Sequence, residues 1–244
     1  MICILVSLKK EIEPFLETLT ETHGRRVRGT TLREGSHRGI PVRIAVTGMG
    51  AGTPPETLQG CTVVVSTGFC GALQPDMRCG DPVVSREVTY AGKELLERIT
   101  GPRVYGSPFE GTGLFRLRLS ERLGKHLAET ARESGLTLHE GRSVSCARVI
   151  RTEMEKRKLE AYFDALAVDM EDYLRVCAAR STGIEALSVR AVLDELVDEV
   201  PSFRGGVKLR GAVSLYRKIP RVQRSLALLL GETLSFLADT MEIV

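Results

Sequence analysis

Short runs of β-branched and other apolar residues alternate along this chain with segments of helical pattern. The runs include ICILV at 2–6, PVRIAV at 41–46, CTVVVST at 61–67, RSVSCARVI at 142–150 and IEALSVRAVL at 184–193. Continuous apolar strands between helices are typical of a sheet that is buried on both faces. We therefore predict the α/β class, with a mixed, mostly parallel central sheet flanked by helices in one domain over residues 1–244.

The segments between these runs give further expectations. Helices are predicted over 9–19, over 151–166 and from about Pro220 toward the end of the chain. The stretch STGFCGALQPDMRCGDPVV at 66–84 is expected to leave a strand as a turn and to become extended again at Gly80-Asp81. The Gly/Pro-rich segment 101–113 is typical of a long surface loop, which in such folds often borders a site.

Charge and cysteine usage exclude several classes of protein. The 34 basic and 31 acidic residues leave a net charge of only +3, which gives no argument for a nucleic-acid partner. The six cysteines form no CxxC pair, so we expect a reduced, cytosolic chain without metal or cofactor. The last apolar run is interrupted by Gly231, Glu232 and Asp239, so we expect an amphipathic terminal helix and no transmembrane segment.

A glycine-rich turn follows the strand predicted at 41–46. Gly48, Gly50 and Gly52 do not complete the GxGxxG pattern of dinucleotide-binding folds. Glycines here still let a backbone N–H approach an anion or a sugar hydroxyl, because no Cβ stands in the way. A tight turn without a ligand explains the same residues, so the sequence leaves both interpretations open.

Four segments that follow or end predicted strands are more informative together than each is alone. The segments TGFCGALQP at 67–75, AVDME at 167–171 and SVRAVLD at 188–194 follow in this order, with ILVSLKKEI at 4–12 ahead of them. Over nearly the whole chain this pattern resembles the nucleoside phosphorylase/nucleosidase superfamily, and within it the nucleosidases that hydrolyse methylthioadenosine and S-adenosylhomocysteine. The resemblance implies a small-molecule nucleoside substrate and a homodimer. It also implies that Gly68, Phe69 and Gly71 line the nucleoside site.

The resemblance implies two catalytic carboxyl groups. Cleavage of an N-glycosidic bond needs an acid for the departing purine and a positioned nucleophile. Asp194 matches the family's general acid, which protonates purine N7; an N-cap of a helix beginning at Glu195 is the structural alternative. Glu11 matches the glutamate that activates water, although Glu13 lies close by and an acid in a first helical turn also suits the helix dipole.

Further positions match the family's substrate contacts. Glu171 matches the carboxylate that accepts hydrogen bonds from the two ribose hydroxyls, and Met170 the methionine that packs on the sugar. A start of a helix also explains an acid at this position, because Asp169 and Asp172 flank it. Val149 and Ile150 lie where the family grips adenine, but Val149 replaces the usual phenylalanine, which leaves base stacking open.

The choice between water and phosphate depends on arginines. Phosphorylases of the superfamily carry an arginine at the position of Ser66 and a second one in an N-terminal GDP turn, which this chain lacks. Without them a phosphate dianion loses its bidentate partners, so the sequence favours hydrolysis. Phosphorolysis, and a non-catalytic protein that binds a nucleoside or a lipid headgroup, remain as alternatives.

The C-terminal third is similar to the hopanoid-associated phosphorylases, a group thought to remove adenine from adenosylhopane. Residues 204–224 contain seven Lys or Arg and no acid, with apolar residues between them. Such a segment suits an anionic membrane surface on which a lipid substrate resides, and equally the solvated face of an ordinary helix. With Phe69 and the segment Pro201-Ser202-Phe203, this pattern predicts an apolar, open 5′ side of the pocket.

Overall fold

One mixed sheet runs through the molecule. The computed structural model describes residues 1–101, 113–118, 121–201 and 209–240. In this part of the chain the sheet has ten strands, namely β1 (Ile2–Val6), β2 (Thr20–Val27), β3 (Thr30–His37), β4 (Ile40–Val46), β5 (Val63–Ala72), β6 (Pro82–Ala91), β7 (Leu114–Arg116), β8 (His139–Cys146), β9 (Ala167–Asp169) and β10 (Glu185–Asp194).

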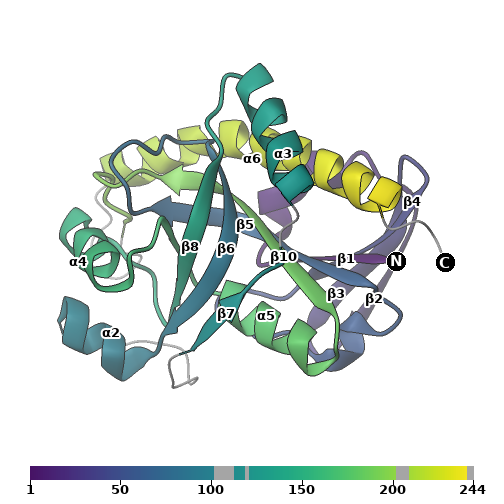
Figure 1. The fold of residues 1–244 in the computed structure, drawn as a ribbon, viewed down its shortest axis with the longest axis horizontal. Coiled ribbons are helices and arrows are strands. Elements are labelled where there is room, and N and C mark those ends of the chain that lie inside the picture. Colours follow the sequence, from purple (N-terminus) through teal and green to yellow (C-terminus); the bar gives the residue numbers. More distant parts are fainter. Residues whose placement is uncertain (102–112, 119–120, 202–208, 241–244) are drawn as a thin grey trace.

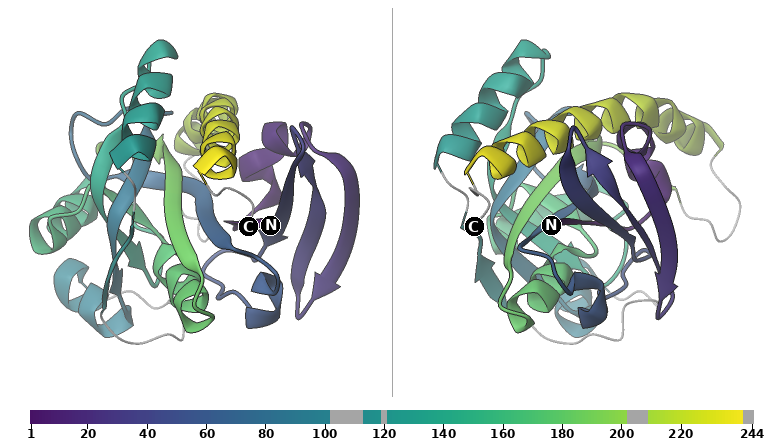
Figure 2. Two further views of the ribbon diagram at one scale, coloured as in Figure 1. Left: turned by 45° about the vertical axis from the view of Figure 1, so that its right-hand side comes forward. Right: turned by 90° about the vertical axis from the view of Figure 1, so that its right-hand side faces the viewer.

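Helices pack around this sheet (Figure 1). The described ones are η1 (Lys9–Ile12), α1 (Glu13–Leu16), η2 (Pro55–Leu58), α2 (Lys93–Thr100), α3 (Glu121–Glu133), α4 (Glu153–Phe163), α5 (Asp172–Ser181) and α6 (Leu209–Thr240). Figure 2 shows α6 running across one side of the sheet while α5 lies on the other. The predicted α/β class with a mixed central sheet is confirmed.

The sheet closes on itself in part. Strand β5 pairs in parallel with β1 and β10, and β1 in parallel with β4. From β10 the pairing continues through β6, β8 and β9 and returns to β5, which makes a closed ring of strands. Strands β4, β1, β5 and β10 therefore end at the same edge, where parallel sheets commonly place their ligand sites.

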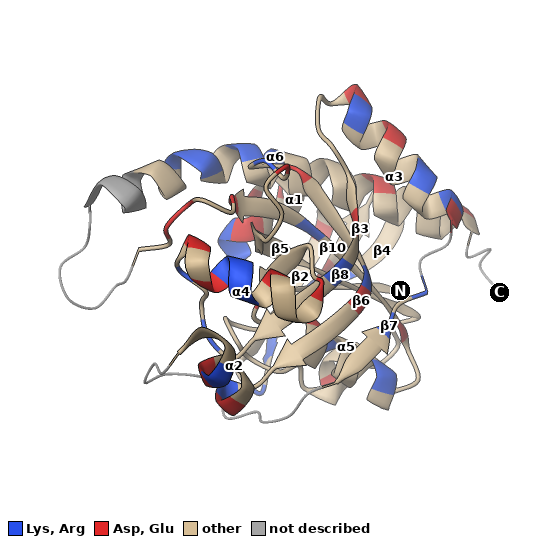
Figure 3. Cartoon of the chain, turned by 60° about the vertical axis from the view of Figure 1, so that its left-hand side comes forward, with Lys and Arg blue, Asp and Glu red and all other residues tan. Residues whose placement is uncertain are grey.

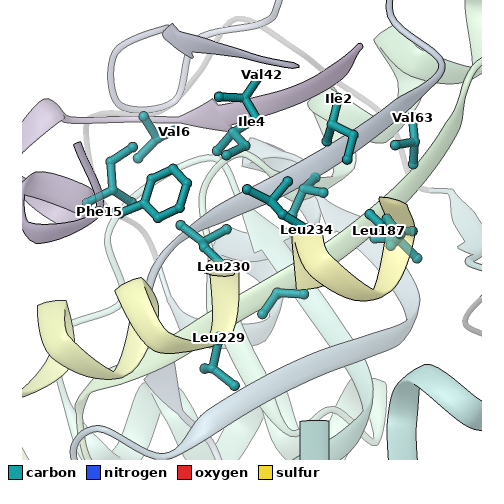
Figure 4. Packing of buried hydrophobic residues seen from close by; sticks show 14 of the residues in the cluster. Ile2, Ile4, Val6, Phe15, Val42, Val63, Leu187, Leu229, Leu230 and Leu234 are labelled. Atoms are coloured by element: carbon teal, nitrogen blue, oxygen red, sulfur yellow. The ribbon is translucent and has the colours of Figure 1, made fainter. Parts of the chain in front are cut away.

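Strand β1 shows why its sequence is apolar throughout. Successive side chains of a strand point to opposite faces. Ile2, Ile4 and Val6 pack in the cluster that includes Leu230 and Leu234 of α6 (Figure 4), whereas Cys3 and Leu5 belong to a second cluster with residues of α5. Both faces of β1 are covered, so every residue of the strand is buried.

Two expected boundaries were wrong. Residues 66–72 continue strand β5 and are no turn, because Ser66 to Gly71 keep pairing with β10; only 73–81 connect β5 to β6. The last helix begins at Leu209 and not at Pro220, which lies inside it. Because proline has no backbone N–H, Pro220 leaves the carbonyl of Tyr216, four residues earlier, without its helical partner. Both residues are exposed, so water can solvate this carbonyl.

Two other expectations concerned the surface loop at 101–113 and the character of the last helix. Of the loop expected at 101–113, residues 102–112 lie outside the described residues. Within the described part of the chain, no helix combines the length and the apolar character needed to cross a membrane, α6 included.

Candidate active site

A cavity of about 380 Å³ opens where β1, β5, β9 and β10 end. It is lined by Ser7, Leu8, Lys10, Glu11, Met49, Phe69, Cys70, Gly71, Arg148, Val149, Ile150, Val168, Asp169, Met170, Glu171, Leu193, Asp194, Val200, Pro201, Leu215, Tyr216 and Ile219. Every side chain predicted to contact the substrate lines this cavity, and Gly50 and Gly68 lie against its residues Met170 and Glu11.

Glu11 lies in η1, the short helix that follows β1, as a buried carboxylate. Its Oε1 accepts a hydrogen bond from the Phe69 N–H at 3.0 Å and its Oε2 one from the Leu8 N–H at 2.8 Å. Burial raises the pKa of Glu11, and these two backbone donors partly oppose that rise. Glu13 is exposed and does not line the cavity, so Glu11 is the acid that the fold brings to the site.

Gly68 is required for this placement. Its φ of +142° is a conformation that L-residues rarely adopt, and a Cβ there would lie 2.9 Å from Glu11 Oε1. The glycine of β5 therefore makes room for the carboxylate.

Glu171 lies at the start of α5 and reaches the glycine turn after β4. Its Oε1 accepts a hydrogen bond from the Gly50 N–H at 2.8 Å, and Gly50 has a φ of +63°. Met170 also approaches Gly50, with its Cε 3.4 Å from where a Cβ would stand. The turn that the sequence left ambiguous thus holds a site carboxylate, although no GxGxxG motif is present.

A network of buried charges lies at the base of the cavity, and we call it the floor. Glu11, Asp169 and Glu171 line the cavity, and Asp172, Arg175 and Arg190 lie behind them. Arg190 of β10 donates to Asp172 Oδ1 at 2.8 Å and to the Phe69 carbonyl at 2.8 Å. Its guanidinium also lies 3.6 Å from Asp169 Oδ2 and 3.7 Å from Glu171 Oε2. One guanidinium therefore holds three carboxyl groups together.

The two aspartates of the floor differ in protonation. Burial raises the pKa of Asp169 to about 7, with Arg190 opposing the rise. Burial acts on Asp172 in the same direction, but Arg190 and hydrogen bonds from Ser188 and Ser66 outweigh it and lower the pKa to about 2. Asp172 therefore keeps its negative charge at neutral pH, whereas Asp169 gains or loses its proton near pH 7.

Arg175 of α5 lies in the deepest part of the floor and is held by both of its terminal nitrogens. Its guanidinium donates to the Leu5 and Thr67 carbonyls and to the hydroxyls of Ser66, Ser7 and Thr47. These bonds tie the ends of β1 and β4 to the middle of β5. Arg175 is completely buried and does not line the cavity.

Asp194 ends β10 opposite Gly71 of β5. A register shift between Val192 and Asp194 brings the carboxyl group over Gly71, where a Cβ would come within 2.7 Å of its Oδ2. Lys156 of α4 lies 2.6 Å from the same oxygen. Burial raises the pKa of Asp194, and Lys156 acts against that rise. Residues 195–201 form no helix, so the alternative of a helix N-cap at Asp194 was wrong.

Apolar residues make up the walls and the entrance. Phe69, Val149, Ile150 and Met170 line the walls, as expected. We define the rim as Leu8, Lys10, Met49, Leu215, Tyr216 and Ile219, which join the ends of β1 and β4 to α6. Leu8 is 44%, Met49 64% and Tyr216 57% exposed, and the Lys10 ammonium lies 5.5 Å from the centre of the Tyr216 ring.

Sequence reasoning did not identify several charged residues of the site. Arg190 could have been found, since a single arginine interrupts the apolar run IEALSVRAVL. Lys156 offered no such signal, because it stands among the other charges of RTEMEKRKLEAYFDAL. Of the rim, Leu215, Tyr216 and Ile219 fall within the basic segment 204–224, but residues 202–208 lie outside the described residues.

The comparisons with known proteins place the chain in the superfamily that its sequence resembles. A family model described as "Phosphorylase superfamily" matches residues 1–206. The purine nucleoside phosphorylase DeoD-type of Bacillus cereus (strain B4264) is 29% identical over 192 residues, which is 75% of this chain and 75% of that protein. A DeoD-type phosphorylase from Bacillus cytotoxicus matches to the same extent.

Solved structures share the fold at lower identity. The 5′-methylthioadenosine/S-adenosylhomocysteine nucleosidase of Neisseria meningitidis superimposes with a TM-score of 0.74 at 17% identity, covering 97% of this chain and 99% of that one. The futalosine hydrolase of Helicobacter pylori gives 0.73 at 19% identity and covers 97% of each chain.

Proposed function

The chain belongs to the phosphorylase superfamily, and from this premise we propose that it hydrolyses the N-glycosidic bond of a 5′-substituted adenosine. Asp194 is the acid that protonates the purine, and Glu11 takes the proton of the attacking water. Glu171 accepts hydrogen bonds from the ribose hydroxyls. Phe69, Met170, Val149 and Ile150 enclose the sugar and the base.

The charge of the floor is the observation that carries this proposal. Four carboxyl groups face two guanidiniums, and both guanidiniums are bound within the protein. Even with a proton on Asp169 the floor is negative. Loss of the purine leaves positive charge on the ribosyl group, which such a floor stabilises as it develops. The same charge opposes the binding of a phosphate dianion.

The roles of the two catalytic carboxyl groups follow from their surroundings. The backbone N–H groups of Phe69 and Leu8 orient Glu11, which faces the ribosyl group as a base. Asp194 is buried over Gly71, which favours the neutral carboxylic acid, and the Lys156 ammonium at 2.6 Å from its Oδ2 acts in the opposite direction. A raised pKa in each case brings the proton transfers nearer to neutral pH.

Phosphorolysis is the second candidate function, because the DeoD-type relatives are phosphorylases. A phosphate site needs a free cation near the floor. The described cations lining the cavity are Lys10 and Arg148, and Arg148 is bound to Glu155 at 2.9 Å and to Thr100 at 2.7 Å. Lys10 belongs to the rim. These contacts favour water over phosphate.

One experiment separates hydrolysis, phosphorolysis and binding without catalysis. Purified protein is incubated with 5′-methylthioadenosine and with adenosines carrying longer 5′-alkyl groups, in phosphate-free buffer and with added phosphate. We expect adenine and a free ribose product at a rate that phosphate does not raise. A ribose 1-phosphate as the main product would identify a phosphorylase, and binding without adenine release would identify a non-catalytic protein.

The rim supports a large apolar 5′ substituent. If the ribose hydroxyls bind at Glu171 and the purine at Asp194, the rim residues Leu8, Met49 and Ile219 are left for the 5′ side of the substrate. We propose that this substituent is a hydrophobic group, with the hopane skeleton of adenosylhopane as the most specific form of the proposal. The enzyme is then a cytoplasmic homo-oligomer that touches the membrane peripherally.

Basic residues of α6 support the membrane contact. Arg217, Arg221 and Arg224 are exposed on the helix that carries the rim. Figure 3 shows Lys and Arg positions in blue along α6. Exposed basic residues beside an apolar rim suit an anionic lipid surface. Sedimentation with phosphatidylglycerol vesicles at low salt tests this: we expect binding that salt reverses, and no binding to neutral phosphatidylcholine vesicles. Absence of binding to either kind of vesicle would identify a solvated helix face.

A further inference from the structure

Lys156 is a buried cation next to the proposed acid. It lies on α4, whose first turn is fixed by reciprocal hydrogen bonds between Thr152 and Glu155. The ammonium is completely buried and lies 2.6 Å from Asp194 Oδ2. It also donates to the backbone carbonyls of Glu195 and Asp198, at 2.5 and 3.3 Å. Its three N–H protons thus have three acceptors on the segment that carries the acid.

These contacts leave Lys156 no donor for a substrate. It does not line the cavity, whereas Asp194 does. Asp194 Oδ2 is enclosed between the ammonium and Gly71, so Oδ1 is the oxygen left to the cavity. Lys156 therefore acts on the reaction only through Asp194.

The ammonium dominates the charges around Asp194. The other ionisable groups that face the carboxyl are Asp198 of the following segment, Lys218 of α6 and the buried Cys70 thiol of β5. Lys218 is itself paired with Asp198, so these two largely cancel. When Asp194 gives up its proton, the carboxylate that forms is left in contact with the Lys156 ammonium.

We propose that Lys156 is a positioning residue that holds Asp194 by Oδ2 and stabilises the carboxylate formed when Oδ1 transfers its proton to the leaving purine. The inference rests on the proposed function, in which Asp194 is the acid. As the bond from C1′ to purine N9 breaks, its electron pair goes to the purine and the Asp194 proton goes to N7. Water adds to C1′ and gives its proton to Glu11.

The test removes the charge and keeps the length of the side chain. Lys156→Met is compared with Lys158→Met, because Lys158 is an exposed lysine on the same helix. For adenine release we expect K156M to lower kcat by about 10–100-fold with KM nearly unchanged. The alkaline limb of its kcat profile should move to higher pH, because Asp194 keeps its proton longer without the neighbouring ammonium. K158M should show neither effect.

A second substrate separates proton delivery from loss of structure. A nitrophenyl riboside has a leaving group that departs without protonation, so the K156M loss should be much smaller with it than with adenosine substrates. Lys156→Arg, which keeps the charge, should keep the alkaline limb near that of the wild type and serves as the test if K156M does not fold.

Two results would overturn the proposal: an alkaline limb of K156M that coincides with the wild type, or equal losses with both leaving groups. Failure of the proposed function has a different signature, because the wild type itself would then release no adenine or would require phosphate.

Discussion

The floor and the rim of the cavity differ in how firmly their side chains are held. Floor groups such as Glu11 and Arg190 are buried and bonded to backbone and to one another from several strands. Rim residues such as Leu8, Met49 and Tyr216 are exposed, and the Tyr216 ring contacts the Lys10 ammonium. On the proposed function, the floor and Asp194 determine which bond is broken, whereas the rim determines which 5′ group is accepted.

The largest effects should come from the two catalytic carboxyl groups. Asp194→Asn cannot protonate the purine and Glu11→Gln cannot accept a proton from water, so each should lower kcat by about 10²–10⁴-fold. Steady-state kinetics with a check of the fold by circular dichroism measures this. Asp76→Asn and Glu13→Gln are matched controls, since both residues are exposed and outside the cavity. Near-normal turnover of D194N would remove Asp194 as the acid.

The ion pairs of the floor should contribute strongly to the stability of the fold. Arg190→Met leaves Asp169, Glu171 and Asp172 without their shared guanidinium, and we expect it to lower the free energy of unfolding by about 3–5 kcal/mol. Urea denaturation measures the change. Arg224→Met, at an exposed position of α6, should stay within about 0.5 kcal/mol of the wild type. An equally stable R190M would show that the floor is not held together by its ion pairs.

Glu171 should affect recognition of the ribose. Glu171→Gln weakens charge-assisted hydrogen bonds to the two hydroxyls, and we expect kcat/KM to fall by about 10–100-fold. The same substitution should matter much less for a 3′-deoxy substrate, which already lacks one of these bonds. If E171Q lost the same factor with both substrates, Glu171 would hold the floor and not the sugar.

The pH dependence should report both carboxyl groups. Toward acid pH, kcat/KM should fall by about tenfold per pH unit as Glu11 takes up a proton, and toward alkaline pH it should fall likewise as Asp194 loses its proton. Because burial raises both pKa values, both limbs should lie above the usual carboxyl range near pH 4. An acid limb near pH 4 would show that Glu11 is not the group that titrates.

The rim should give the smallest effects and change only substrate preference. Each methylene of a 5′-alkyl group buried at the rim should improve kcat/KM about fourfold, from about 0.8 kcal/mol. Ile219→Ser should reduce this gain per methylene and leave the turnover of 5′-methylthioadenosine nearly unchanged. If I219S lowered kcat for every substrate alike, the division between floor and rim would be wrong.

Much of the fold follows from local pattern, and the errors have physical reasons. The doubly buried strands β1, β5 and β10 were predicted because their apolar runs reflect burial on both faces. The end of β5 was missed because Gly68 and Gly71 suggest a turn, whereas their missing side chains make room for Glu11 and Asp194. The start of α6 was missed because an exposed proline is tolerated inside a long helix.

The sequence indicated the carboxyl groups that follow strands, but it did not indicate the lysine that reaches the site from a separate helix. Glu11, Glu171 and Asp194 follow apolar runs within a few residues, and the resemblance to a known family assigned all three to one site. The contact of Lys156 with Asp194 joins residues 38 positions apart in the sequence, from a helix with many charges. Only the three-dimensional packing of α4 against the end of β10 selects this lysine from its neighbours.

The origin of the new oxygen on the ribose tests the central claim most directly. The protein is incubated with 5′-methylthioadenosine in ¹⁸O-labelled water that contains unlabelled phosphate, and the sugar product is analysed by mass spectrometry before its C1′ oxygen exchanges with solvent. A negative floor with Glu11 as base predicts one ¹⁸O at C1′ in every product molecule, at a rate independent of phosphate. An unlabelled sugar 1-phosphate would contradict it.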